Sequence, residues 1–280
     1  MNDAAEEWVR CLSARELPVL RHTARRLDEA RARLDRLSAG DIAKIVCQDP
    51  FLAARTLLYI QPLTSRRLHN DVTTIAGAIT MMGVEPFFHK FDNLPLLEDA
   101  FQEAPKDALL RLLKVVRRAR QASHFARDWA LWRVDVNVEE VALAALLYDL
   151  AEMLIYAFFP TRAYHIYRLR LANPHVRSAT IQNKVLGCTG SDIQQTLCRQ
   201  WKFPALFQAL YANEHANSPR VKNVVLAVSL ARHLAHEGWR DRALPEDLRE
   251  IGELLNLSQD ALGERLGLRP PDAEQLAEAT

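Results

Sequence analysis

The sequence predicts an all-α protein built from many helices, and three observations support this prediction. The chain has 280 residues with only 9 glycines, and it is rich in Ala, Leu, Arg and Glu, which favour helix over sheet. Apolar residues recur at helical spacing in successive segments. From Val141 to Phe159 the only charged residues are Asp149 and Glu152. Because so apolar a stretch must be surrounded by other segments, we expect it to form a central buried helix.

The boundaries of this stretch are those of a core helix rather than of a membrane span. Asn137 is a good N-cap, Glu139 and Glu140 lie in the first turn where the helix dipole favours them, and Pro160 ends the run. Two carboxylates at mid-span would cost about 2.5 to 3.5 kcal/mol each in a bilayer, so we expect no membrane partner. A buried Asp149 then needs a cation, a metal or several hydrogen bonds, or else it takes up a proton.

The N-terminal part of the chain has the pattern of amphipathic helices. Residues 1 to 37 place leucines at roughly helical spacing among many charged residues. Ser38, with Asp41 three residues later, is typical of a helix N-cap.

Prolines and threonines mark the next boundaries. Asp49-Pro50 ends one helix and begins the next, because proline is well accommodated at the first helical position. Pro62 is expected to end that second helix. Thr73 or Thr74 is expected to cap the helix that follows.

The C-terminal part predicts two small amphipathic helices and a looser end. Pro245 stands near the start of the first, and a second short helix is expected from about Ser258 to Gly267. Pro270-Pro271 marks the looser end. Residues 241 to 280 contain ten acids and four arginines.

Several classes of protein are disfavoured by composition. The four cysteines show no C-x-x-C spacing, and the net charge is +1, so neither a zinc or redox motif nor a nucleic-acid partner is indicated by these alone. No Gly-rich phosphate loop, nucleophile elbow or dinucleotide fingerprint occurs, and we expect no cofactor. The charged N-terminus does not resemble a signal peptide, which favours a cytoplasmic location. His233 and His236, three residues apart, are interpreted as structural or surface histidines because no acidic or Cys partner stands nearby in sequence.

Two motifs in the first half resemble the bacterial HDOD domain, the HD-related output domain. The segments DIAKIVCQDPFLAARTLLYI and VTTIAGAITMMGV resemble the family's "D-P-x-L-x-x-[KR]-[LV]-L" and "[IV]-x-[ST]-[IL]-x-x-A-[IV]-x-x-[LM]-G" patterns. The matching residues are Asp49, Pro50, Leu52, Arg55, Leu57, Val72, Thr74, Ile75, Ala78, Ile79, Met82 and Gly83.

The second half extends the resemblance in order but not in chemistry. The segments VVRRARQASHFA, ALLYDLAEML, LGCTGSDIQQTLCRQWKFP and ALYANEHAN stand where the family carries its "W-x-H-S", "G-L-L-H-D-[IL]-G-[KR]-L", "G-x-x-H" with "W-x-[FL]-P", and "H-H" motifs. The resemblance runs from about Leu17 to Trp239 and implies the helical HDOD fold.

The metal ligands of the related HD phosphohydrolases are largely missing from the matching positions. In those enzymes a His, an adjacent His-Asp pair and further His or Asp residues hold one or two divalent metals, which activate a water nucleophile. Of that ligand set only Asp149 is retained. His215 and His124 are further candidate ligands that do not match the family positions well. The vestigial positions are Arg118, Tyr148, Asp149, Glu152, Gly190 and His215. We therefore expect no catalytic residues and no metal.

The replacement of a ligand by an arginine suggests a different role for the remaining carboxylate. If Arg118 stands in place of the metal-binding His, its guanidinium would supply the cation that a buried Asp149 needs. This ion pair is a hypothesis that rests on the two substitutions occurring together.

Basic residues are concentrated in two stretches, although the net charge is small. Lys106 to Arg120 contains six basic residues and only Asp107, and Met153 to Asn213 contains seven against Asp192. Such a surface binds an anionic partner, namely a nucleotide, a nucleic acid or an acidic protein, or it is simply solvated. The candidate anion- or partner-binding residues are Arg162, Arg168, Arg170, Arg177 and Lys184.

The prediction is therefore an all-α HDOD-like protein with an N-terminal helical lobe (1–100), an HD-like helical lobe with a central buried helix (101–240), and an acidic helical tail (241–280). The resemblance, together with the missing ligands, implies a non-catalytic regulatory protein that binds partner proteins in bacterial signalling. The alternatives are a metal-dependent phosphohydrolase with rearranged ligands and a nucleotide or nucleic-acid binder. Metal content separates the first alternative from the others, and salt dependence tests the second.

Overall fold

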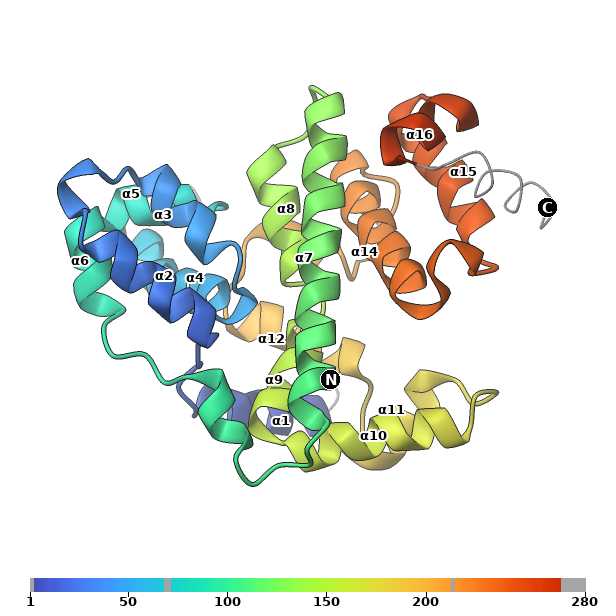
Figure 1. Ribbon diagram of the computed structural model, residues 1–280, viewed down its shortest axis with the longest axis horizontal. Helices are drawn as coiled ribbons and strands as arrows, with labels where there is room; N and C mark the ends of the chain where they lie inside the picture. Colours follow the sequence, from blue (N-terminus) through green and yellow to red (C-terminus); the bar gives the residue numbers. More distant parts are fainter. Residues whose placement is uncertain (1–2, 68–71, 213–214, 268–280) are drawn as a thin grey trace. The chain divides into compact units, whose positions relative to one another are not determined.

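The all-α prediction is confirmed. The computed structural model describes residues 3–67, 72–212 and 215–267 (Figure 1). Helices and turns make up this part of the chain, and its one β-type pairing is an isolated parallel bridge between Val19 and Leu96. The predicted looser end at Pro270-Pro271 lies outside the described residues.

The chain divides into two compact units, and each takes up two separate stretches of sequence. Unit 1 comprises Met1–Arg117 and Leu147–Gln208, and unit 2 comprises Arg118–Leu146 and Ala209–Thr280. The predicted lobes were contiguous stretches, whereas the chain passes between the units three times: inside one long helix, α7 (Ala108–Trp132), directly before Leu147, and after Gln208.

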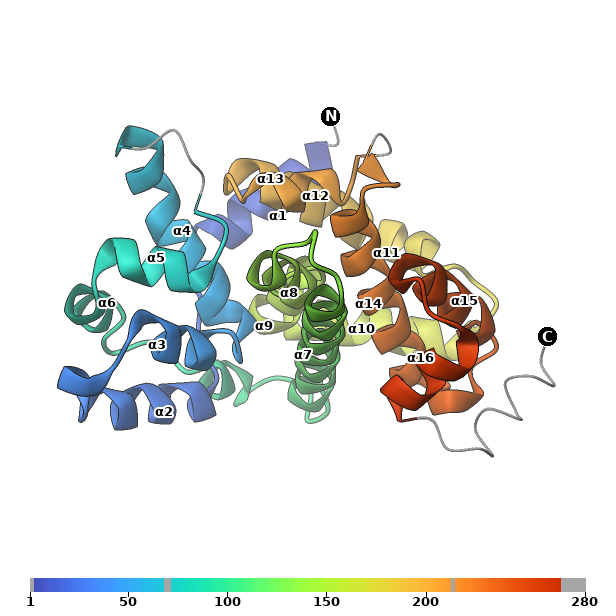
Figure 2. The same ribbon diagram turned by 90° about the horizontal axis from the view of Figure 1, so that it is seen from above.

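The first half of unit 1 is a group of short helices. In it α3 contacts both α2 and α5 and lies between them (Figure 2). The elements are α1 (Asp3–Ser13), α2 (Arg21–Arg31), η1 (Leu34–Arg36), α3 (Ala39–Val46), α4 (Pro50–Arg67), α5 (Ile75–Met82), α6 (Val84–Lys90) and η2 (Leu97–Phe101).

The predicted helix caps of this region are observed. The Ser38 hydroxyl accepts a hydrogen bond from the Asp41 N–H, and the Asp41 carboxylate accepts one from the Ser38 N–H, which is a capping box. The Thr74 hydroxyl accepts from the Gly77 N–H at 3.1 Å and caps α5. Gly83 follows α5 with φ 90°, a backbone conformation that favours glycine.

The prediction that Pro62 ends its helix was wrong, because α4 continues through it to Arg67. Proline removes one backbone donor and its ring crowds the preceding turn. Here the Pro62 residue is exposed and stands near the C-terminal end of α4, where few turns remain to be disturbed. Local sequence rules overestimated the effect of this proline.

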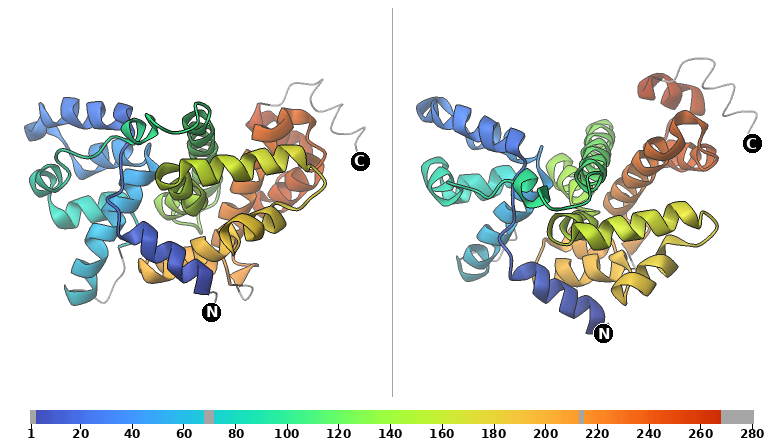
Figure 3. Two further views of the ribbon diagram at one scale, coloured as in Figure 1. Left: turned by 90° about the horizontal axis from the view of Figure 1, so that it is seen from below. Right: turned by 60° about the horizontal axis from the view of Figure 1, so that its bottom comes forward.

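The second half of unit 1 contains α9 (Leu150–Phe158), α10 (Pro160–Ala172), α11 (Ser178–Leu186), α12 (Gly190–Gln200) and α13 (Ala205–Ala209). The helices α10 and α11 form a hairpin (Figure 3). The α1 helix packs against α12, and the Trp8 indole N–H donates to the Leu186 carbonyl at 2.9 Å. The N-terminal helix is therefore part of this group.

The predicted central helix is two helices, which corrects one detail of the prediction. Asn137 caps α8 (Val138–Leu146) through a bond from the Glu140 N–H, and Pro160 begins α10 directly after α9 ends. Between α8 and α9 the residues Leu147 to Asp149 form a turn. Val138–Phe158 is apolar and long enough to cross a membrane by length and composition alone, and 72% of its apolar window is buried within the protein, as expected of a core segment.

Unit 2 contains the second part of α7, α8, α14 (Pro219–Glu237), η4 (Gly238–Arg240), α15 (Leu244–Leu255) and α16 (Gln259–Leu266). The α14 helix packs against α8 and α15. The two C-terminal helices were predicted, with Pro245 in the first turn of α15 and Ser258 capping α16.

Candidate functional site

The turn between α8 and α9 carries the Tyr148-Asp149 pair, at the position that the family resemblance assigns to metal ligands. Asp149 is the N-cap residue of α9, with φ −100° and ψ 25°, but its side chain does not cap the helix. Tyr148, Asp149 and Glu152 are half-buried, so Asp149 is more accessible than the expected buried carboxylate.

Gln194 of α12 supplies the hydrogen bonds that the turn leaves open. Its side-chain oxygen accepts from the Ala151 N–H at 2.6 Å, and its amide nitrogen donates to the Leu147 carbonyl at 3.1 Å. The Ala151 N–H lies in the first turn of α9, where helix geometry provides no intrahelical acceptor, whereas the Leu147 carbonyl also accepts from the Leu150 N–H at 3.2 Å. Gln194 is 3% exposed, so it is a buried brace between α12 and the turn. Sequence reasoning missed this residue, although a glutamine between Ile193 and Leu197 on a buried face was the available signal.

The residues at the vestigial positions do not fit a metal centre. Gly190 has no side chain, and its N–H donates at 2.9 Å to the Gln182 side-chain oxygen. His215 is exposed and belongs to unit 2, as does Arg118, whereas Tyr148 and Asp149 belong to unit 1. Within the described part of the chain, no three His, Cys, Asp or Glu side chains are grouped in a way that could hold a metal ion. The ion pair between Arg118 and Asp149 stays a prediction, since the two residues lie in different units.

Glu152 and Tyr156 lie one turn apart on α9, near basic side chains of two other helices. Burial and, to a lesser degree, the Glu152 charge raise the pKa of Tyr156 to about 12, and the positive charges of Arg111 and Arg170 act in the opposite direction. Tyr156 is therefore a neutral phenol at physiological pH.

The five candidate anion-binding residues are all exposed but do not converge on one pocket. The Arg162 guanidinium lies over the Trp8 ring, 5.4 Å from its centroid. Arg177 is the N-cap residue of α11, and Lys184 lies on the same helix. Arg168 contributes to a shallow depression of about 550 Å³ along α10.

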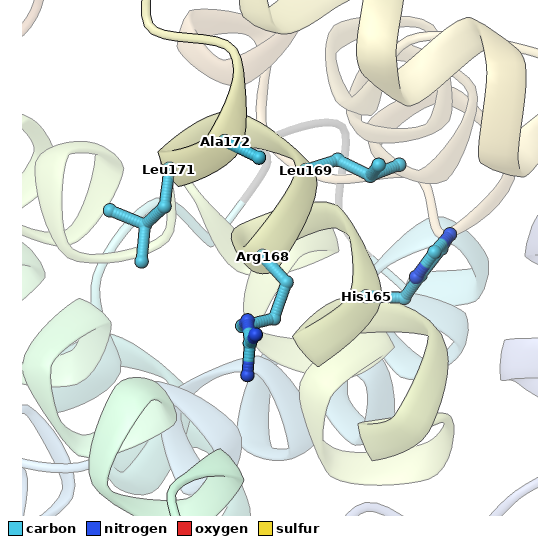
Figure 4. A pocket seen from close by; sticks show the side chains of 5 residues that line it. All are labelled: His165, Arg168, Leu169, Leu171 and Ala172. Carbon is cyan, nitrogen blue, oxygen red and sulfur yellow. The ribbon is translucent and has the colours of Figure 1, made fainter.

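This depression is not an enclosed binding site. It is lined by His165, Arg168, Leu169, Leu171 and Ala172, all from α10. Figure 4 shows that their side chains leave the helix in different directions instead of pointing at a common centre. A small molecule would therefore find few converging polar groups here.

Comparison with known proteins gives one matching family and several similar structures. The family model of the HDOD domain matches residues 17–217. No match was found among curated proteins. The structure of the MmoQ response regulator from Methylococcus capsulatus str. Bath is similar, with a TM-score of 0.69 and 17% identity over 90% of this chain and 98% of that one. A virulence factor from Campylobacter jejuni subsp. jejuni gives a TM-score of 0.67 and 18% identity over 97% of this chain and 99% of that one. At these identities the two structures show the fold alone.

Proposed function

Because the chain belongs to the HDOD domain family, we propose that it is a non-catalytic regulatory protein that acts in bacterial signalling by binding partner proteins in the cytoplasm. The observation that carries this proposal is the α8–α9 turn. There Tyr148 stands beside Asp149, Gly190 offers no side chain, and Gln194 ties the turn to α12 through backbone groups. The similar structure named as a response regulator supports a signalling context.

The side chains at the matching positions are poorly suited to bind a catalytic metal. A divalent metal that activates water needs several imidazole or carboxylate ligands around it with a position left open. In unit 1 the matching positions offer a phenol (Tyr148), two carboxylates (Asp149 and Glu152) and a glycine (Gly190), and no imidazole. The same turn instead serves the fold, because it holds two helix ends in place through one buried amide. We propose that this structural use has replaced the metal-binding use.

Hydrolysis of bis(p-nitrophenyl) phosphate with added Mn²⁺ tests the proposal. We expect no release of nitrophenol by the wild type beyond the rate in buffer. The decisive comparison uses Asp149→Asn and a matched control, Asp128→Asn, at an exposed position on α7. Turnover that requires Mn²⁺, disappears in Asp149→Asn and persists in Asp128→Asn would overturn the non-catalytic proposal.

A further inference from the structure

The two basic stretches of the sequence meet in unit 1, where the beginning of α7 contacts α10. The Tyr164 hydroxyl donates to the Asp107 carboxylate at 3.3 Å. One turn further along each helix, the Arg111 guanidinium lies 4.1 Å from the centroid of the Tyr167 ring, a cation–π contact. Residues more than fifty positions apart in sequence therefore form one surface.

Helical spacing shows which side chains flank this contact. On α10, Arg168 and Leu171 stand four and seven residues after Tyr164, and so share its face. On α7, the residues on the face of Asp107 are Leu110, Lys114 and Arg117, three, seven and ten residues later. We call Leu110, Lys114, Arg117, Arg168 and Leu171 the α7–α10 surface.

The charged side chains of this surface are all basic. The sequence has no acid between Asp107 and Asp128, and none between Glu152 and Asp192. Asp107 itself accepts the Tyr164 hydrogen bond. Lys114, Arg117 and Arg168 are exposed, and they form no ion pair with the residues that the structure describes.

Apolar side chains are exposed among these charges. Leu110 is 50% exposed and Leu171 is 61% exposed, and Leu113, beside Lys114, is 37% exposed. A surface that used only phosphate contacts would need the positive charges but not the leucines. Exposed apolar side chains surrounded by arginine and lysine instead fit a protein interface, which has an apolar centre and a polar rim.

We propose that the α7–α10 surface binds an acidic protein segment that also presents apolar side chains, such as an amphipathic helix with Glu on its rim and Leu at its centre. The inference rests on the proposed function, because it names the chemistry of the partner. Complementary charge would orient the segment, and burial of Leu110 and Leu171 would add affinity that salt does not screen.

Fluorescence anisotropy with four labelled probes tests this proposal. The probes are a peptide with Glu and Leu at helical spacing, a peptide of the same composition with the leucines scattered around the helix, polyuridine RNA, and anionic phospholipid vesicles. We expect the wild type to bind the amphipathic peptide about tenfold more tightly than the scattered one, which corresponds to about 1.4 kcal/mol. Equal affinity for the two peptides, no binding of either, or tighter binding of RNA or vesicles would overturn the proposal.

Matched variants locate the binding to the surface. We expect Arg168→Glu to weaken peptide binding by about tenfold and Leu171→Ser to remove the preference for the amphipathic peptide. The controls are Arg33→Glu, at an exposed arginine of unit 1, and Val134→Ser, at a fully exposed valine. Thermal melts verify that each variant is folded. If the controls weaken binding as much as the surface variants do, the assignment to this surface is wrong.

The two proposals fail independently of each other. Mn²⁺-dependent hydrolysis would overturn the proposal of a non-catalytic protein, and the peptide-binding result would not change. Absence of a preference for the amphipathic peptide would overturn the binding proposal for the α7–α10 surface, and the proposal of a non-catalytic protein would stand.

Discussion

At the scale of single residues, Gln194 decides how the α8–α9 turn is held. One side-chain amide both accepts from the Ala151 N–H and donates to the Leu147 carbonyl. A buried backbone group without a partner costs about 1 to 3 kcal/mol, so the bond that Gln194 gives the Ala151 N–H contributes to the stability of the turn.

We predict that Gln194→Ala lowers the free energy of unfolding by about 2 to 4 kcal/mol, because it removes both bonds and leaves a small cavity. Chemical denaturation followed by circular dichroism measures the change. Gln195→Ala, at the exposed neighbouring position on α12, is the control and should change stability little. Equal effects of the two variants would show that the brace has no energetic importance.

The buried thiols are a second property of single residues. Burial raises the pKa of Cys198 to about 12 and that of Cys188 to about 11, whereas Cys11 is exposed. The thiolate is the reactive form, so at pH 8 we expect iodoacetamide to modify Cys11 first and to leave both buried thiols unmodified in the folded protein. Mass spectrometry of peptides gives the order, and early labelling of Cys198 would contradict it.

The same shifts fix the sign of the pH dependence. From the ordinary thiol pKa of 9.0 upward, the unfolded chain releases protons that the folded chain retains at Cys188 and Cys198. Their contribution to the free energy of unfolding is therefore fully present below pH 9 and is lost as pH rises toward 11 and 12.

At the scale of elements, Asp49 connects the start of α4 to the segment before α2. Its carboxylate accepts from the N–H groups of Phe51 and Leu52 in the first turn of α4, and from that of Leu20 at 2.8 Å. Burial raises the pKa of Asp49, while these backbone donors act to lower it. The family motif at Asp49-Pro50 is therefore a structural junction in this chain.

We predict that Asp49→Ala lowers the free energy of unfolding by about 2 to 4 kcal/mol, because three buried N–H groups lose their acceptor. Asp41→Ala, which removes a solvent-accessible cap of α3, is the comparison and should have a clearly smaller effect. Urea denaturation of both variants measures the difference. A smaller loss for Asp49→Ala than for Asp41→Ala would contradict this explanation of the motif.

A second junction joins α14 to α15 in unit 2. The Asp247 carboxylate lies 2.5 Å from His233 Nδ1 and accepts from the Ser229 hydroxyl at 3.0 Å. The Asp247 carboxylate contacts both the Ser229 hydroxyl and the His233 ring. The cluster is therefore not arranged as a serine nucleophile beside a histidine base. The interpretation of His233 as a structural or surface histidine assumed that it had no acidic partner, and Asp247 was too distant in sequence to be recognised as one.

We predict that Asp247→Ala lowers the protection of α15 amides against hydrogen exchange by about tenfold or more, because the partly buried side chains of Ser229 and His233 on α14 lose their partner. Glu246→Ala, at the exposed neighbouring position, should leave the protection unchanged. Hydrogen exchange followed by mass spectrometry gives the values for residues 244–255. Unchanged exchange in Asp247→Ala would show that apolar packing alone holds α15.

At the scale of the whole molecule, sequence patterns predicted the helices well and the contacts between them poorly. Ser38, Thr74, Asn137 and Ser258 were recognisable as caps because capping depends on residues within one turn. The turn after Leu146 was missed because nothing in an unbroken apolar run indicates it. Its contacts with Gln194, more than forty residues later, leave no local signal in the sequence.

The candidate site was predictable only in part, for the same reason. Sequence alone identified Tyr148-Asp149 and the two basic stretches. The contacts that join those stretches, from Tyr164 to Asp107 and from Arg111 to Tyr167, depend on the packing of α7 against α10. Long-range packing of this kind leaves no periodic signal in a single sequence.

The measurement that tests the central claim most directly is the metal content of the full chain, purified without chelator and then titrated with Mn²⁺ by calorimetry. If the α8–α9 turn has a structural role in place of a metal-binding one, the protein should carry no stoichiometric metal, and the titration should show no saturable heat that Asp149→Asn abolishes. One or two tightly bound metal ions per chain, lost in Asp149→Asn and retained in Asp128→Asn, would contradict it.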